Sequence, residues 1–308
     1  MAERVTTLPT DLPAFKQRLG RTGVWLVSLS AVTADEERRA VAAIEDLGYG
    51  TLWIGEPPTG KEALTHAALL LSASRRLMVA TGIATIYGRD ATAAVNGART
   101  LHEAWQGRFV LGLGVSHRPL VHGRGHDSST PLSDMRAYLD AMDATPFDAP
   151  APEPVPRVLA ALRPKMLKLA ATRAQGAHPY FVTPEHTRRA RATLGPDPLL
   201  APEQAVVVDT DPERARATAR AYAAVYLRLP NYLNNLRELG FTDADFDDGG
   251  SDTLIDAVVP WGDPETLAER IREHYRAGAD HVAVQPIADT LQQQLQDLRL
   301  LAPALMPG

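Results

Sequence analysis

Residues 34–55 read ADEERRAVAAIEDLGYGTLWIG, and this stretch decides the fold. Apolar side chains at Val41, Ile44 and Leu47 recur at helical spacing, and Gly48 follows where such a helix would end. The run TLWIG after them is short, apolar and rich in strand-forming residues. The stretch therefore predicts an amphipathic helix, a glycine C-cap and a strand buried on both faces, which is the αβ unit of a parallel sheet.

The same order of helix, glycine and strand recurs further along the chain. Residues 167–175 precede Gly176 and the run HPYFV, and residues 267–276 precede Gly278 and the run HVAVQ. The alternation favours an α/β fold, a (β/α)8 TIM barrel, although an open three-layer sheet would alternate in the same way. We predict strands at 24–28, 51–55, 77–84, 109–114, 157–161, 178–182, 205–208 and 281–285 and helices at 34–47, 62–73, 90–105, 131–143, 164–175, 184–193, 211–227 and 263–277.

Two segments depart from this repeat. Residues 144–156 are proline-rich and are interpreted as an extended crossover, because αβ units lie on both sides. Residues 229–261 form an insertion before the last strand, which we expect to cover one rim of the barrel mouth and to close over a substrate through Tyr226, Arg228, Asn231 and Tyr232. We therefore expect a single barrel domain over residues 1–308.

Composition excludes several classes of function. The formal net charge is −5 with scattered basic residues, which argues against a nucleic-acid partner. The absence of cysteine excludes disulfides, thiolate metal sites and cysteine nucleophiles. No apolar run approaches the ~20 residues of a membrane span, and residues 1–21 lack the apolar core of a signal peptide. A cytoplasmic protein without a membrane partner is the expectation.

In a barrel, polar residues that follow the strands face the active site. Glu56 directly follows TLWIG, so it is a candidate catalytic carboxylate, with helix capping as the alternative role. Gly82 interrupts the apolar run of the third strand. A glycine there predicts a bulge or a close approach of backbone to a ligand, and tight packing is equally open.

The fourth predicted strand ends in the segment FVLGLGVSH, residues 109–117. Gly112 and Gly114 would let the backbone approach a planar or anionic ligand, although the segment lacks the third glycine of a dinucleotide fingerprint. His117 is a candidate acid or base. A metal bound by His117, His122 and His126 is disfavoured, because that spacing matches no known ligand pattern.

Two predicted helices begin at the mouth in a way that suits a phosphate group. Pro164 opens the helix after the fifth strand, where Arg163 and Lys165 add positive charge, and Thr183 is the expected N-cap of the next helix. A plain helix start is the alternative. Motifs of serine hydrolases, zinc proteases, P-loop enzymes and glycosidases are absent, which favours chemistry carried by a bound cofactor.

The segments LGYGTLWIGE, LMVATGIATI, GRFVLGLGVSH, RPKMLKLAATRAQGAHPYFVTPEH and AGADHVAVQ together resemble the luciferase-like monooxygenase superfamily. Within it, they are similar to actinobacterial oxidoreductases that use the deazaflavin coenzyme F420. The resemblance implies a non-prolyl cis peptide at Gly82–Ile83 that presses on the cofactor ring. It further implies a cofactor-binding set that consists of Gly82, Ile83, Gly114, Val115, Ser116, Pro164, Lys165, Tyr180, Val182 and Thr183.

The chain departs from the sugar-phosphate dehydrogenases of that superfamily. They have glutamate where this chain has His117, and an Asp-His pair near Glu56 and Pro57, so oxidation of glucose 6-phosphate is not expected. The resemblance implies hydride transfer between F420 and a small organic substrate, with His117 and Glu56 as catalytic residues and no metal. An FMN-dependent monooxygenase, a flavin- or metabolite-binding barrel without turnover and, more remotely, a metal-dependent hydrolase stay open. The resemblance also implies a homodimer through the second and third helices. The apolar stretch at 63–71 permits this, although the same stretch would pack on the sheet in a monomer.

Overall fold

A computed structural model describes residues 11–127, 129–150 and 154–306. Parts of the predicted N-terminal segment and of the proline-rich crossover lie outside these residues. All paired strands of the sheet are parallel. They are β1 (Thr22–Trp25), β2 (Thr51–Ile54), β3 (Met78–Thr81), β4 (Ala84–Thr85), β5 (Phe109–Gly114), β6 (Arg157–Leu159), β7 (Gly176–Ala177), β8 (Leu199–Leu200), β9 (Glu203–Val206) and β10 (Val282–Pro286).

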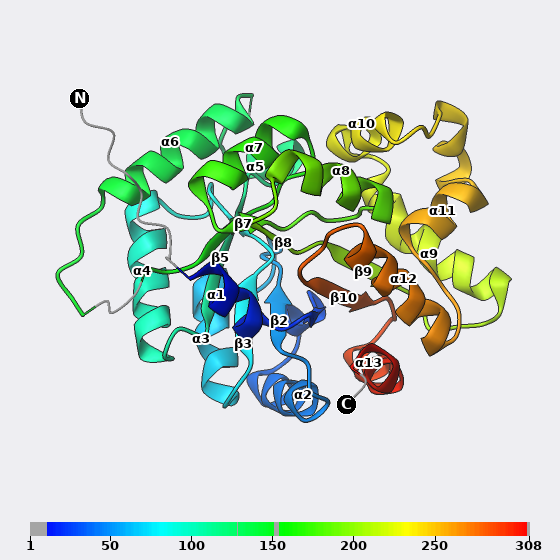
Figure 1. Cartoon of the computed structure of the whole chain (residues 1–308), viewed down its shortest axis with the longest axis horizontal. Helices are drawn as coiled ribbons and strands as arrows, with labels where there is room; N and C mark the ends of the chain where they lie inside the picture. The colour runs from blue at the N-terminus through cyan, green and yellow to red at the C-terminus, as the bar shows by residue number, and fades with distance from the viewer. Residues whose placement is uncertain (1–10, 128, 151–153, 307–308) are drawn as a thin grey trace.

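The sheet closes on itself to form the predicted TIM barrel (Figure 1). The strand order is β8-β7-β6-β5-β3-β2-β1-β10-β9, and β8 and β9 are two pieces of one segment interrupted at Ala201 and Pro202. Because the first piece pairs with β7 and the second with β10, this segment joins the two edges of the sheet. β3 and β4 are likewise two pieces of one barrel strand, so the barrel has eight strands.

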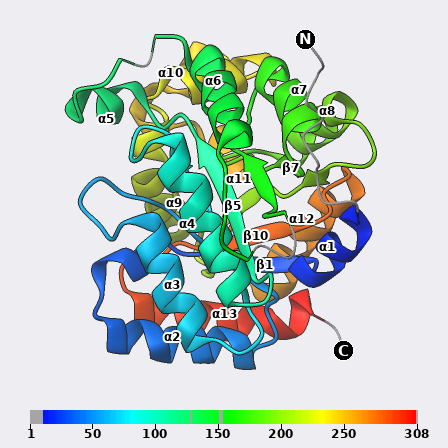
Figure 2. The same ribbon diagram turned by 90° about the vertical axis from the view of Figure 1, so that its left-hand side faces the viewer.

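In the described part of the chain, eight helices cover the outside of the barrel, and each follows its strand. Consecutive helices pack against one another around the sheet. They are α2 (Ala34–Asp46), α3 (Ala63–Ala73), α4 (Ala91–Ala104), α6 (Pro131–Ala144), α7 (Pro164–Arg173), α8 (Pro184–Leu194), α12 (Pro264–Arg276) and α13 (Leu291–Leu305). Of these, α13 was not predicted. Figure 2 shows α2, α3 and α4 side by side on one face. None of the helices in the described residues is long and apolar enough to cross a bilayer.

The barrel interior is apolar at its N-terminal end. Helix α1 (Leu12–Leu19), also unpredicted, places Phe15 and Leu19 against inward-facing residues such as Trp53, Met78 and Val110. Thr51 Oγ1 donates to the Leu19 carbonyl at 2.6 Å and so ties this plug to the sheet. The N-terminal end is therefore filled, which leaves the C-terminal end for a site.

The inserted unit is larger than the sequence indicates. Helix α9 (Pro212–Tyr226) was predicted as a helix of the barrel repeat, yet its buried alanines pack with α10 (Pro230–Glu238) and α11 (Asp252–Val258) in a separate core. These three helices form a group at one side of the barrel (Figure 1). The predicted boundary at 229 is thus late, because an amphipathic pattern does not reveal which partner a helix covers.

Most predicted strands overlap an observed strand but have limits that differ at one or both ends, as at β1, which was predicted at 24–28. Two predicted strands also pair at other residues than expected. The strand predicted at 178–182 pairs at Gly176–Ala177 instead, since Pro179 cannot donate to a ladder and Phe181 has a left-handed φ of 56°. The strand predicted at 205–208 begins pairing at Leu199 and ends at Val206. Both errors lie where a strand is interrupted by proline.

Candidate active site

The predicted site residues lie on one arc of the barrel mouth. They follow β2, β3/β4 and β5 or begin near α7 and α8, which follow β6 and β7. These five barrel strands are consecutive neighbours in the sheet, so their C-terminal ends adjoin. The residues on this arc are Glu56, Gly82, Ile83, Gly114, Val115, Ser116, His117, Pro164, Lys165, Tyr180, Val182 and Thr183.

The break between β3 and β4 contains the bulge that the sequence predicts. Ala80 pairs with Val110, but Ala84 pairs with Leu113, so this strand carries one more residue than its partner over the same length. The Gly82–Ile83 peptide in this break is cis, as the resemblance implies. Both residues are half-buried although Thr81 and Ala84 are buried, so the bulge turns this peptide toward the open mouth.

Glycines in β5 make room for this bulge. A Cβ at Gly112 would lie 1.8 Å from the Thr81 carbonyl oxygen, and one at Gly114 would lie 2.6 Å from Ile83 Cγ1. Thr81 Oγ1 also donates to the Gly112 carbonyl at 2.7 Å and accepts from its N–H at 2.8 Å. The absence of side chains at Gly112 and Gly114 therefore allows β5 to pack tightly against the bulge. Tight packing is also the alternative to ligand contact that the sequence left open for Gly82.

His117 lies at the end of the β5 segment. Ser116 before it has a left-handed φ of 55°, and His117 is the N-cap of the short helix α5 (Arg118–Gly123), which was not predicted. Burial lowers the pKa of His117, which favours the neutral imidazole at pH 7. Its ring centroid lies 5.6 Å from that of Tyr232 on α10. No hydrogen bond to this imidazole occurs among the described residues, so it is free to engage a ligand.

Glu56 is held by several donors. Its Oε2 accepts from Thr85 N at 2.8 Å, Ala63 N lies 3.5 Å from its Oε1, and it forms an ion pair with Arg89. The side chain is 4% exposed. These contacts tie β4 and the start of α3 to the loop after β2. The contact with Ala63 N, at the first residue of α3, corresponds to the helix-capping role that the sequence left open for Glu56. The catalytic role of Glu56 stays a prediction.

The predicted phosphate-binding region consists of two helix starts. Helix α7 begins at Pro164 and α8 at Pro184, and Thr183 Oγ1 accepts from His186 N as the N-cap of α8. Arg163 is bound to Glu238 of α10 at 2.6 Å. Lys165 is exposed and makes no ion pair with a described residue. Lys165 is thus the side chain whose positive charge this region can offer to a phosphate group.

Sequence reasoning missed how aromatic residues gather opposite the bulge. Trp25 Nε1 donates to the Gly82 carbonyl at 3.0 Å, and its ring lies 5.1 Å from that of Tyr180. The Tyr180 hydroxyl lies 2.9 Å from the Tyr226 hydroxyl and 3.0 Å from that of Tyr222 on α9. Their clustering could not be seen, because the residues come from distant segments with no shared motif.

A buried carboxyl group lies behind these rings. Glu203, at the start of β9, is 1% exposed, and its Oε2 accepts from Phe181 N at 3.1 Å. Its Oε1 has no hydrogen-bond partner among the described residues. Burial raises the pKa of Glu203 to about 8, so this group is mainly neutral at pH 7. In the sequence, the one mark of this buried carboxyl group is a charged residue that opens the apolar run EQAVVV.

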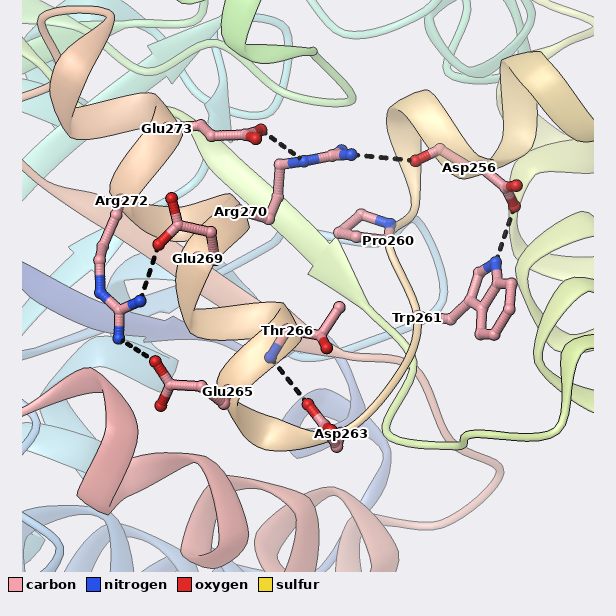
Figure 3. A pocket seen from close by; sticks show the side chains of 10 residues that line it. All are labelled: Asp256, Pro260, Trp261, Asp263, Glu265, Thr266, Glu269, Arg270, Arg272 and Glu273. Carbon is pink, nitrogen blue, oxygen red and sulfur yellow. Dashed lines mark hydrogen bonds and ion pairs between the residues drawn. The ribbon is translucent and has the colours of Figure 1, made fainter.

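A second hollow lies outside the barrel, beside α12 (Figure 3). Its volume is about 710 Å³, and its lining is rich in acidic residues and arginine. The lining residues are Asp256, Pro260, Trp261, Asp263, Glu265, Thr266, Glu269, Arg270, Arg272 and Glu273. No cluster of three or more histidine, aspartate or glutamate residues suited to a metal ion occurs in the described part of the chain.

With this architecture, the chain belongs to the family described as luciferase-like monooxygenase, whose family model matches residues 18–281. A Mycobacterium tuberculosis protein named as a coenzyme F420-dependent oxidoreductase is 33% identical over 121 residues, which are 39% of this chain and 35% of that relative. The 5,10-methylenetetrahydromethanopterin reductase of Archaeoglobus fulgidus is 25% identical over 83% of this chain and 91% of that protein. The relatives are thus oxidoreductases.

Solved structures of low sequence identity share the fold. An F420-dependent secondary alcohol dehydrogenase in complex with an F420-acetone adduct has a TM-score of 0.72 at 16% identity, over 92% of this chain and 98% of that one. A coenzyme F420-dependent tetrahydromethanopterin reductase from Methanopyrus kandleri has 0.73 at 16%, over 93% and 98%. The oxygenating constituent of 3,6-diketocamphane monooxygenase from Pseudomonas putida, in complex with FMN, has 0.68 at 14%, over 93% and 98%.

Proposed function

We propose that this protein is an oxidoreductase that transfers hydride between coenzyme F420 and a small organic substrate. The observation that carries the proposal is a neutral His117, without a hydrogen-bond partner among the described residues, on the same arc as the half-buried Gly82–Ile83 peptide. The F420-dependent name of the Mycobacterium tuberculosis relative favours this cofactor, as do the F420-dependent enzymes among the structures that share the fold.

The residues of the mouth fit a flavin-like group. The half-buried Gly82–Ile83 peptide offers a surface for a planar ring, with Val115 and Ser116 on the adjoining strand end. The N-terminal turns of α7 and α8 offer backbone N–H groups, and Lys165 offers charge, for the phosphate of a side chain. The cofactor-binding set proposed here is therefore the one that the sequence predicts.

When bound, deazaflavin supplies a ring carbon that donates or accepts hydride. The remaining task is to move a proton at the substrate oxygen. His117 is suited to it because burial lowers its pKa and so keeps the imidazole in the neutral form, which can accept a proton, at pH 7. Glu56 ties the loop after β2 to the end of β4 through Thr85 N. We propose that Glu56 assists from this position. Trp25 fixes the Gly82 carbonyl through its indole N–H.

Binding of the two candidate cofactors tests this function. Purified protein is titrated with F420 and with FMN, and quenching of cofactor fluorescence is followed in each case. We expect F420 to bind in the micromolar range or tighter and FMN to bind at least about tenfold more weakly. Tight binding of FMN without binding of F420 would overturn the proposal.

A second candidate is an FMN-dependent monooxygenase. It is favoured by the shared fold of the FMN-containing monooxygenase constituent from Pseudomonas putida. This candidate predicts that protein loaded with reduced FMN consumes oxygen in the presence of substrate, which an oxygen electrode measures. A protein that binds either cofactor but turns over none of a panel of alcohols and ketones would instead be a binding barrel.

We further propose that the protein acts as a homodimer. Helix α3 leaves Leu69 39% exposed next to the buried Leu70 and Leu71, so part of its apolar surface is free to meet a second copy. Light scattering after size-exclusion chromatography is expected to give about twice the chain mass of 33.3 kDa. A mass near 33.3 kDa would contradict the dimer.

A further inference from the structure

The wall opposite the bulge is polar at its surface but carries no charge. We call this the tyrosine wall and define it as Tyr180, Tyr222, Tyr226 and Gln285. The three tyrosine side chains are half-buried, so part of each ring remains accessible. Trp25 joins the wall to the cofactor side, because it contacts Tyr180 and donates to the Gly82 carbonyl.

The hydrogen atoms of the wall can be assigned. Tyr180 donates its single hydroxyl hydrogen to Gln285 Oε1 at 2.8 Å, so Tyr226, at 2.9 Å, must donate to Tyr180. Tyr222 also donates to Tyr180, at 3.0 Å. Tyr226 also bonds to the Tyr222 hydroxyl, and because a phenol oxygen has two lone pairs, the oxygens of Tyr222 and Tyr226 keep capacity to accept from a ligand. The Nε2 group of the Gln285 amide, which we call its free end, likewise has no hydrogen-bond partner among the described residues.

The titratable groups around the wall are uncharged at neutral pH. Burial raises the pKa of Tyr226 to about 12 and moves the pKa values of Tyr180 and Tyr222 well above their usual range. Glu203 behind the wall is mainly neutral, and so is His117 beside it. An anion would therefore lose its hydration here without gaining a cation as partner.

Resting on the proposed function, we propose that the tyrosine wall is the substrate-binding face of the site and selects an uncharged substrate. The substrate has a flat or cyclic carbon frame that packs on the rings. Its carbonyl or hydroxyl oxygen accepts from the free end of the Gln285 amide, and a hydroxyl group can also donate to the oxygen of Tyr222 or Tyr226. Sugar phosphates and carboxylates are excluded by this face.

Three compounds with the same ring test this selectivity. Acetophenone is a neutral ketone, benzoate is an anion, and ethylbenzene has no oxygen. Binding of each is measured by equilibrium dialysis at pH 7, with the protein free and loaded with F420. We expect acetophenone to bind at least about tenfold more tightly than benzoate and several-fold more tightly than ethylbenzene. Benzoate binding as tightly as acetophenone, or failure of acetophenone to bind, would overturn the inference.

A matched pair of variants locates the binding to the wall. Tyr226→Phe keeps the ring and removes an acceptor oxygen. We therefore expect binding of 1-phenylethanol, the alcohol with the same ring, to fall several-fold while binding of acetophenone and ethylbenzene stays. Tyr275→Phe is the control, because the Tyr275 hydroxyl bonds to Thr22 Oγ1 and the Arg21 carbonyl at the opposite end of the barrel. An equal loss in both variants would contradict the assignment.

The two proposals fail separately. If F420 does not bind but acetophenone is preferred over benzoate, the cofactor assignment is wrong and the substrate face stands. If F420 binds and benzoate is preferred, the oxidoreductase stands and the uncharged substrate is wrong. Thermal unfolding of Tyr226→Phe and Tyr275→Phe, compared with the parent, separates loss of binding from loss of folding.

Discussion

The barrel mouth and the hollow beside α12 differ in how their polar groups are satisfied. In the outer hollow, Arg272 binds Glu265 at 2.7 Å and Glu269 at 2.8 Å, and Arg270 binds Glu273 at 2.9 Å (Figure 3). At the mouth, His117, Glu203 Oε1 and one end of the Gln285 amide have no hydrogen-bond partner among the described residues.

Whether the polar groups of a hollow are already paired indicates function better than the volume of the hollow does. The outer hollow is spacious, but its charged groups are paired and face solvent, which is how a helix surface is normally stabilised. The mouth combines burial with unused hydrogen-bonding capacity, a costly arrangement that a ligand would relieve. We therefore place the chemistry at the mouth and expect substitutions in the two regions to differ widely in effect.

The largest expected effect is that of His117→Ala. Removal of a proton-transferring group costs roughly 100- to 10,000-fold in rate, so kcat/KM should fall by at least about 100-fold for any substrate that the parent turns over. The consumption of F420 absorbance measures it, and binding of F420 should change little. Turnover equal to that of the parent would show that the assigned role is wrong.

The pH profile gives an independent check on His117. Because burial lowers its pKa, the imidazole stays neutral as the pH falls to 6.5, the usual value. Substrate oxidation that needs the neutral base should therefore decline only below that pH. The His117→Ala variant should lack this acidic limb, whereas a limb retained in the variant would assign it to another group.

Gly112→Ala should destabilise the fold strongly. The new Cβ would lie 1.8 Å from the Thr81 carbonyl oxygen, a backbone atom that cannot turn aside, so we expect a loss of about 3 kcal/mol or more in unfolding free energy. Gly123→Ala is the control, since a Cβ there meets nothing within 4 Å. Urea denaturation measures both, and equal stability of the two variants would contradict the close contact at the bulge.

Glu203→Gln should change how stability depends on pH. The folded pKa of about 8 exceeds the ordinary value of 4.5, so the parent has its full stability below 4.5 and loses stability as the pH rises toward 8. The variant avoids this loss and should gain up to about 3 kcal/mol relative to the parent between pH 4.5 and 7. The titratable groups that face Glu203 are tyrosines with raised pKa values, which stay neutral in this range.

Urea denaturation at pH 5, 6, 7 and 8 measures this difference. Asp297→Asn is the matched comparison. Burial also raises the pKa of Asp297, but its hydrogen bond from Gln293 lowers that pKa, so we expect the difference in stability between parent and variant to widen less with pH. The difference in unfolding free energy between the parent and Glu203→Gln should widen from pH 5 to 7. If it does not, Glu203 is not a neutral carboxyl group in the folded protein.

The barrel was predictable from sequence because its signals are local. Each αβ unit shows a helical period, a glycine and an apolar run within about twenty residues, as at 34–55. The limits of β5 and the start of α7 at Pro164 were predicted correctly for the same reason. The affiliation of α9 was not predictable, since its pattern fits packing on the barrel and packing on α11 equally well.

The site was predictable where backbone chemistry leaves a mark. Gly82 in an apolar strand indicated the bulge, and Thr183 before Pro184 indicated the helix cap. Tyr180 and Tyr226 were predicted as separate site residues, but their grouping with Tyr222 and Gln285 left no mark in the sequence. These residues lie on β10, on α9 and in the loop after β7, and only the tertiary fold brings them together. Local signals thus located the mouth, and the three-dimensional arrangement was needed to describe its surface.

The smallest expected effect is that of Glu269→Gln in the outer hollow. Glu269 is exposed and shares its charge between Arg272 and Arg276, so water replaces the lost ion pairs at little cost. We expect the unfolding temperature to change by about 1 °C or less and F420 binding and turnover to stay within about twofold. A differential scanning measurement and the cofactor titration check these expectations. If this variant instead impaired cofactor binding, paired charges would not be the sign of a purely structural surface, and the assignment of chemistry to the mouth would lose its basis.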